Sequence, residues 1–200
     1  MPPAATSSIF DEFYAEWRAL SKPKGQILPL RSALQPTRIK NLLPYFFLVE
    51  KTGQEVIVNK IIGTELDQRL GRNYTGSRVI DAYRPTQRRY LYDFYDCLAN
   101  TPVGAHFTRK VTHEEGDSFM HDTLIFPLLA KDLEPRYFAG VATISKTFDQ
   151  TPAEARAKEY REAFITSLEY LDVGAGLPEN PPSVELHNSA YGSTLTLGPT

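Results

Sequence analysis

The sequence that decides the fold begins at Val103 and reads VGAHFTRKVTHEEGDSFMHDTLIFPLLAKDLEPRYFAGVATISK. Apolar and polar side chains alternate along it with a period of two, which is typical of β-strands. The alternation is interrupted twice by charged and turn-forming residues, and it therefore predicts three strands, over Val103–His113, Ser118–Leu129 and 136–146. Because the connections at 114–117 and 130–135 are short, the three strands should run antiparallel.

The residues before this stretch predict the rest of an α+β domain. Two β-rich runs, at 45–51 and 55–61, flank a Thr52-Gly53-Gln54 turn and predict a hairpin. A short helix over 65–70 and a longer one over 85–100 follow, the longer one with apolar residues at helical spacing. This order predicts one antiparallel sheet with helices gathered mainly on one face.

The N-terminal segment predicts an amphipathic helix with an aromatic stripe at helical spacing: Phe10, Phe13, Tyr14 and Trp17. The stripe ends before Lys22-Pro23-Lys24-Gly25, which is typical of a linker. Two interpretations of this helix stay open, because its aromatic face can pack on its own domain or form a dimer contact.

The C-terminal segment predicts a second flanking helix. Thr151-Pro152-Ala153-Glu154 combines a capping residue, a proline at the first helical position and an acidic first turn. The end of this helix is not defined by the pattern, because residues 164–172 could also be extended. Beyond Gly174 the composition turns to Gly, Pro, Ser and Asn, which predicts a polar tail.

The composition excludes several classes of protein. With 42% hydrophobic residues and a net charge of −2 over 200 residues, the chain can bury one real core and is not a disordered protein. Its single cysteine, Cys97, excludes an internal disulfide and a multi-thiolate zinc site. The balanced charge argues against a dedicated nucleic-acid binder. Strand-sized apolar runs and the absence of a secretory signal predict a cytoplasmic protein without membrane spans.

The order of elements, together with two local patterns, resembles a PAS domain, especially the short stand-alone bacterial PAS proteins. The patterns are Ile62-Gly63-Thr64-Glu65-Leu66 at the hairpin exit and Leu70-Gly71-Arg72-Asn73-Tyr74-Thr75-Gly76 after it. Arg31, Pro36 and Leu42-Leu43-Pro44 are similar to the lead-in of that subfamily. The resemblance implies a five-stranded antiparallel sheet cupped by helices around a small-molecule pocket. It divides the chain into an N-terminal helix and linker (1–29), the PAS-like domain (30–148) and a C-terminal helix with a tail (149–200).

The resemblance also implies a role in sensing or relaying signals rather than in catalysis. We expect a homodimer that docks to a signalling protein, such as a histidine kinase or a transcriptional regulator. A scaffold that binds no ligand stays open as an alternative. So does a small hydrolase or isomerase that uses Asp122 with Tyr137 or His121 in a pocket. No nucleic-acid or membrane partner is expected.

The candidate ligand site depends on how two strands pair. If the turn at 114–117 is symmetric, Arg109 faces Asp122, and one largely apolar face meets the helices. Arg109 would then bind a carboxylate or phosphate and Asp122 would orient it, or the two would form a structural cross-strand ion pair. The predicted ligand-binding residues are Arg109, Asp122, Tyr137, Thr143, Phe94, Leu98, Phe107 and Met120.

The opposite face of the same strands carries Phe119 and Phe138 among polar residues, and it is too apolar to be fully hydrated. The aromatic stripe of the N-terminal helix is its natural cover, from the same chain or from a partner. The predicted dimer or partner contacts are therefore Phe10, Phe13, Tyr14, Trp17, Phe119 and Phe138.

The residue types do not support a haem, a flavin or a metal. The four histidines are His106, His113, His121 and His187, and none lies in the long interior helix that supplies the haem ligand in many PAS domains. Cys97 does not lie in the Asn-Cys-Arg-Phe run of flavin photosensors, so a buried core thiol is the simpler interpretation. The expected ligand is an unidentified small organic molecule.

Overall fold

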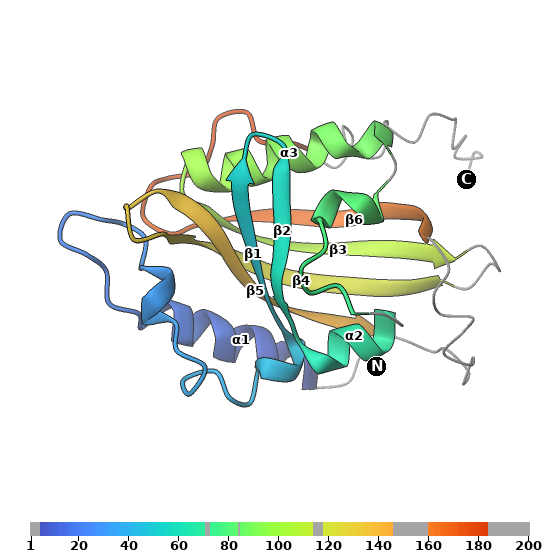
Figure 1. The fold of residues 1–200 in the computed structure, drawn as a ribbon, viewed down its shortest axis with the longest axis horizontal. Coiled ribbons are helices and arrows are strands. Elements are labelled where there is room, and N and C mark those ends of the chain that lie inside the picture. The colour runs from blue at the N-terminus through green and yellow to red at the C-terminus, as the bar shows by residue number, and fades with distance from the viewer. Residues whose placement is uncertain (1–4, 71–72, 84, 114–117, 146–159, 184–200) are drawn as a thin grey trace, which may run out of the picture.

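Six β-strands form one antiparallel sheet at the centre of the computed structural model, in the order β2-β1-β5-β4-β3-β6 (Figure 1). The structure describes residues 5–70, 73–83, 85–113, 118–145 and 160–183. The strands are β1 (Phe46–Gly53), β2 (Val56–Ile62), β3 (Val103–His113), β4 (Ser118–Leu129), β5 (Pro135–Ser145) and β6 (Tyr160–Asp172). The helices are α1 (Ala5–Arg18), α2 (Thr64–Leu70) and α3 (Pro85–Asn100), with 3₁₀ turns η1 (Arg31–Ala33), η2 (Leu43–Tyr45) and η3 (Val79–Ala82). None of these helices is long and apolar enough to cross a membrane.

The structure confirms the α+β class and all five predicted strands, and it adds a sixth. The predicted C-terminal helix is wrong over residues 160–172, where the extended alternative holds: β6 pairs with β3 from Val103↔Asp172 to His113↔Tyr160. The predicted start of that helix, at Thr151, lies outside the described residues. Leu168 and Leu171, two apolar residues at helical spacing in this segment, pack in different clusters rather than on one helix face. A bulge inserts Thr166, so that Ile165 and Leu168 pack in the same cluster.

Both faces of the sheet are covered. α2, η3 and α3 pack on one face, over a cluster that includes Phe47 and Ile125, and we call this the α3 face. α1 packs on the other face, over a cluster that includes Leu124 and Phe126, and we call this the α1 face. In Figure 1, α3 runs across the top of the view and α1 lies at its lower left. The N-terminal helix thus packs on its own domain, as the first of its two interpretations states.

The predicted pairing of β3 with β4 is wrong by one residue. Arg109 pairs with His121, and Thr108 pairs with Asp122. The last pair is Thr112 with Ser118, so residues 113–117 connect the strands, whereas a symmetric connection over 114–117 would pair His113 with Ser118. Because side chains alternate along a strand, this slip means that Arg109 and Phe107 share a face with His121 and Thr123 instead of with Asp122 and Leu124.

The pairing of β4 with β5 agrees with the prediction. Asp122 pairs with Thr143 and Leu128 with Tyr137, so these residues share one face. That face is the α1 face, because its neighbours in the same alternation, Leu124 and Val141, belong to the cluster under α1. The predicted ligand residues of β4 and β5 therefore lie on the face covered by the N-terminal helix, whereas Arg109 and Phe107 of β3 lie on the α3 face.

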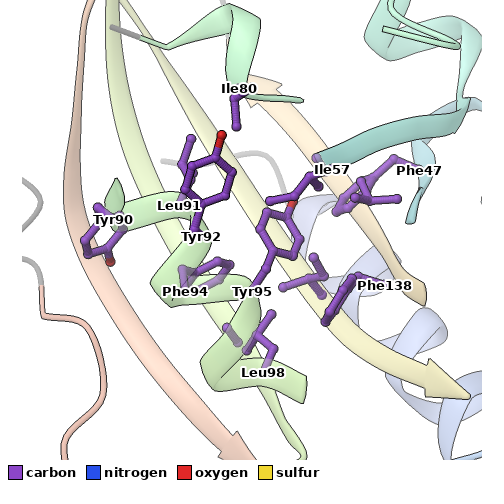
Figure 2. Close-up of a cluster of buried hydrophobic side chains, with 14 of the residues drawn as sticks. Phe47, Ile57, Ile80, Tyr90, Leu91, Tyr92, Phe94, Tyr95, Leu98 and Phe138 are labelled. Atoms are coloured by element: carbon purple, nitrogen blue, oxygen red, sulfur yellow. The ribbon is translucent and has the colours of Figure 1, made fainter. Parts of the chain in front are cut away.

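Aromatic packing holds the helices on the sheet. On the α1 face, the Trp17 ring lies 4.6 Å from the Phe126 ring in a stacked arrangement. Gly104 of β3 leaves room for the Phe126 ring, because a Cβ at that position would lie 2.2 Å from Cε1 of Phe126. On the α3 face, α3 directs its apolar side toward the strands (Figure 2), and the Tyr95 ring lies 4.9 Å from the Phe138 ring.

Candidate functional site

A cavity of about 140 Å³ lies between the α3 face of the sheet and the segment that contains α2 and η3. Most of its wall is apolar or aromatic, and it includes Phe47, Leu66, Val79, Tyr95, Phe119 and Ile125. The wall of β4 comes from its odd-numbered residues, which alternate toward this face. A concave, mainly apolar cavity with a few polar groups is the usual form of a small-molecule site.

Three buried polar side chains gather in this wall. Apart from tyrosine and tryptophan, the buried polar residues of the described part of the chain are Asn59, His121 and Thr123, with exposed fractions of 9%, 8% and 3%. All three line the cavity, together with the guanidinium-bearing Arg109. Burying a polar group without a partner is unfavourable. Of the three, Asn59 and His121 have hydrogen-bond partners, and only the Thr123 hydroxyl has none among the described residues.

Arg109 and His121 form a cross-strand pair in the cavity wall. Nε of Arg109 donates a hydrogen bond to Nδ1 of His121 at 2.9 Å. The guanidinium carbon also lies 5.4 Å from the centre of the Tyr83 ring and 6.0 Å from that of Phe107, within the range of cation–π contacts. These contacts fix the orientation of the guanidinium at the cavity.

His121 is neutral in this environment. Burial, and after it the neighbouring charge of Arg109, holds the pKa of His121 well below its ordinary value of 6.5. Because Arg109 can only donate, Nδ1 of the neutral ring is the acceptor, and the ring proton is on Nε2. His121 therefore carries one N–H donor besides the nitrogen that faces Arg109.

Thr123 contributes a hydroxyl without a partner. Its Oγ1 is buried and forms no hydrogen bond with any residue that the structure describes. Asn59, in contrast, is held in place, because its Nδ2 donates to Oγ of Ser77 at 3.1 Å. The cavity thus combines a fixed amide, a neutral imidazole, a guanidinium and a hydroxyl that lacks a partner.

A β-bulge lies beside Arg109. The pairing of β3 with β6 shifts between Thr108 and Arg109, and Thr166 is the extra residue of β6. The Thr166 hydroxyl donates to the Thr108 carbonyl at 3.1 Å, which stabilises the irregular backbone. Bulges are common next to functional sites, because they redirect a side chain locally.

A separate polar group lies on the α1 face, behind this site. Nε2 of His106 and Oγ1 of Thr108 both lie 3.0 Å from Oδ1 of Asp122. The Asp122 hydrogen bond raises the pKa of His106 despite partial burial. Burial alone would raise the pKa of Asp122, but the hydrogen bonds from His106 and Thr108 lower it below its ordinary value. This hydrogen-bonded group lies next to Phe10 of α1, whose ring lies 5.3 Å from that of His106.

The structure divides the predicted ligand-binding residues between the two faces. Arg109 and Phe107 line the cavity, and Phe94 lines a smaller neighbouring cavity of about 40 Å³ that also borders Arg109. Leu98 is fully buried in the core of the α3 face. The prediction is wrong for the four residues on the α1 face, which are Asp122, Tyr137, Thr143 and Met120. The cause is the one-residue difference in the pairing of β3 with β4.

The predicted partner contacts are also redistributed. Phe119 lines the cavity, and Phe138 is fully buried in the core of the α3 face, so both are wrong as surface contacts of the face under the N-terminal helix. Phe13 and Trp17 are buried against their own sheet, and Phe10 and Tyr14 pack beside them. A homodimer stays a prediction, and these buried side chains are not its exposed surface.

The sequence interpretation missed Asn59, Thr123 and Tyr83 as site residues, and it named His121 only in the enzyme alternative. A signal for two of them was present, because His121 and Thr123 alternate with the apolar residues Phe119 and Ile125 on one side of a strand. Asn59 and Tyr83 come from elements whose position relative to β4 has no local signature. The enzyme alternative loses one of its pairs, since Asp122 and His121 lie on opposite faces. Its other pair is also separated, because Asp122 lies six residues, or about 20 Å, along β4 from the partner of Tyr137.

The described residues contain no group of three or more His, Cys, Asp or Glu side chains that could hold a metal ion. Cys97 is half-buried beside the Tyr170 hydroxyl, and burial raises the pKa of its thiol. It does not line the cavity. The expectations for haem and flavin stay predictions.

Comparisons with known proteins place this geometry in a family. A family model described as a PAS domain matches residues 5–143. No curated protein matches the chain. Similar solved structures include a light-oxygen-voltage domain studied with a flavin analogue, with 10% identity, a TM-score of 0.42 and coverage of 56% of this chain and 84% of that one. An RNA-binding light-oxygen-voltage receptor has 14% identity and a TM-score of 0.39, over 68% of this chain and 38% of that one. A variant of RsLOV also has 14% identity and a TM-score of 0.39, over 78% and 76%.

Proposed function

The chain belongs to the PAS domain family, a family of sensory modules, and from this premise we propose that it senses one small organic molecule bound in the cavity on the α3 face. The observation that carries the proposal is the gathering of Asn59, His121 and Thr123, the described buried polar residues other than tyrosine and tryptophan, in the wall of that cavity. A ligand that hydrogen-bonds to them would remove the unfavourable burial of the Thr123 hydroxyl.

The cavity volume sets the size of the ligand. A cavity of about 150 Å³ in another protein holds one benzene molecule, and the cavity here measures about 140 Å³. We therefore propose a molecule with one ring or a short branched chain. The three fused rings of a flavin need more space, so no flavin is proposed.

The polar groups set its chemistry. The Arg109 guanidinium presents several donors in one plane, which match the two oxygens of a carboxylate. The Nε2 proton of neutral His121 and the hydroxyl of Thr123 add donors from the neighbouring strand. The proposed ligand is a small monocarboxylate, with its apolar body against Phe47, Phe119 and the other apolar residues of the wall.

We also propose how the signal leaves the domain. Ligand binding would favour one arrangement of the elements that flank the sheet. A homodimer partner, or a docked signalling protein such as a histidine kinase or a regulator in the cytoplasm, would then respond to that arrangement. This output rests on the family membership and on the sequence analysis.

The proposal is tested by thermal unfolding with benzoate as the probe acid and benzamide as its neutral counterpart. We expect benzoate to raise the melting temperature in a saturable way and benzamide to raise it less. Arg109→Gln should abolish the benzoate effect, whereas Lys110→Gln, at the exposed neighbouring position of the same strand, should preserve it. Native mass spectrometry of the purified protein covers acids other than benzoate. No retained molecule, together with no response to benzoate or to short-chain acids, would show a scaffold without a ligand.

A further inference from the structure

A second hollow, independent of the proposed sensory cavity, lies where the loop between β4 and β5 meets η1. It measures about 330 Å³, and its polar lining residues are Arg31, Ser32, Glu50, Lys131, Asp132, Arg136 and Tyr137. Tyr137 is the residue that the sequence analysis placed at the ligand cavity. It lies here instead, next to Glu50 of the neighbouring strand.

Two segments that are far apart in the sequence are joined at this hollow. Leu30 forms a parallel bridge with Leu129, and the Leu129 amide donates to the Pro29 carbonyl at 2.9 Å. Arg31 and Lys131 come directly after these two bridged segments, so the bridge brings both side chains to the same hollow. The Arg31 guanidinium is further positioned 6.0 Å above the Tyr137 ring.

The charges of the hollow do not balance. Each of its carboxylates already has a cationic partner, because Glu50 pairs with Nζ of Lys60 at 3.1 Å and Asp132 pairs with Arg136. Arg31 and Lys131, in contrast, form no ion pair with any residue described by the structure. Nε of Arg136 is buried, and no described residue accepts a hydrogen bond from it. The lining therefore holds an excess of donors and of positive charge.

We propose that this hollow binds the phosphate group of a small molecule through Arg31 and Lys131. A guanidinium can grip two phosphate oxygens at once, and a lysine adds a compact positive charge. Together they neutralise a dianion, whereas a single carboxylate would leave one cation without a counter-ion. Ser32 adds a hydroxyl donor at the edge of the same hollow.

The test is a titration of isotope-labelled full-length protein with inorganic phosphate and with glycerol phosphate, followed by amide chemical shifts at constant ionic strength. We expect saturable shifts at Arg31, Ser32 and Lys131. The double variant R31Q/K131Q removes two charge-assisted contacts, each corresponding to about a factor of ten, and should therefore weaken binding about a hundred-fold. The double variant K24Q/K40Q removes the same charge from exposed lysines elsewhere and should bind normally.

The outcomes separate the sources of the phosphate group. Tighter binding of glycerol phosphate indicates an ester whose body also contacts the hollow, and equal binding indicates that phosphate alone is recognised. Shifts that do not saturate, or that persist in R31Q/K131Q, overturn the proposal. Arg31→Lys keeps the positive charge but cannot donate two parallel hydrogen bonds to one phosphate. It should therefore bind phosphate with intermediate affinity, and it serves as a folded control. Arg109→Gln should leave phosphate binding intact, which separates this proposal from the sensory one.

Discussion

The two faces of the sheet use aromatic residues in opposite ways. On the α1 face the rings pack on one another, with Tyr14 and Trp17 stacked on Phe126 at 5.5 and 4.6 Å between ring centres. On the α3 face, Phe47 and Phe119 surround a cavity of about 140 Å³ instead of closing it. Around Phe126 the α1 face is closely packed, whereas the rings of the α3 face leave a cavity between them.

Strand β4 contributes to both faces, which makes the comparison direct. Its even-numbered residues Leu124 and Phe126 belong to the packed α1 face, and its odd-numbered residues His121 and Thr123 face the cavity. The same backbone therefore places buried polar side chains on one side only. Packing alone would favour apolar residues at these positions as well, and this difference is what the proposed ligand would account for.

The largest expected effect breaks the packed face. Phe126→Ala removes a fully buried ring that contacts Trp17, and it should lower the free energy of unfolding by about 3–5 kcal/mol. Phe47→Ala, at the cavity wall, should also lower the free energy of unfolding, but by a loss that is smaller by at least about 1 kcal/mol. The reason is that a side chain beside an existing cavity loses fewer contacts. Urea unfolding followed by circular dichroism measures both. Equal losses would mean that the cavity wall is packed as tightly as the α1 face.

The sequence pattern was sufficient where each element carries its own signal. The alternation from Val103 onward predicted β3, β4 and β5, and the stripe that contains Phe13 and Trp17 predicted α1. Which residues alternate together along each single strand was also predicted. These properties depend on periodicity within a single segment, and the period of a strand or helix is fixed by its own geometry.

Pairing between segments was not predictable in the same way. The pairing of β3 with β4 depends on the length of the connection, and one residue in that length decides whether Arg109 meets Asp122 or His121. β6 likewise forms by pairing along the edge of β3, and its own sequence left a helix and an extended segment open. Four of the eight predicted ligand-binding residues were placed on the wrong face because of this one-residue difference in the pairing of β3 with β4.

An effect of intermediate size is expected in the pH dependence of stability, which should differ between a histidine on each face. His121 stays neutral when folded, so acid favours its protonation in the unfolded chain, and stability falls as the pH drops below about 6.5. His106 has a raised pKa when folded, so it adds stability below about 6.5 that is lost as the pH rises through that raised pKa. Relative to wild type, His121→Gln should gain stability from pH 7 to pH 5, and His106→Gln should lose it.

Urea unfolding of the two variants and of wild type between pH 5 and pH 8 measures this difference. Glutamine keeps an acceptor for Arg109 in the first variant and a donor for Asp122 in the second. The control is the double variant, whose profile should lie between those of the two single variants. If both single variants change in the same direction, the two histidines are not in opposite electrostatic environments.

The smallest expected effect tests the hydroxyl in the cavity against a hydroxyl on the packed face. Thr123→Val replaces a buried hydroxyl without a described partner by a methyl group of similar shape, and it should raise the free energy of unfolding by up to about 1 kcal/mol. Thr108→Val removes a hydrogen bond to Asp122 of 3.0 Å and should lower it by about 1 kcal/mol. The two substitutions are chemically identical, on paired strands, so a difference in sign isolates the environment. If Thr123→Val destabilises the protein as Thr108→Val does, the Thr123 hydroxyl has a partner within the fold, and the cavity wall no longer calls for a ligand.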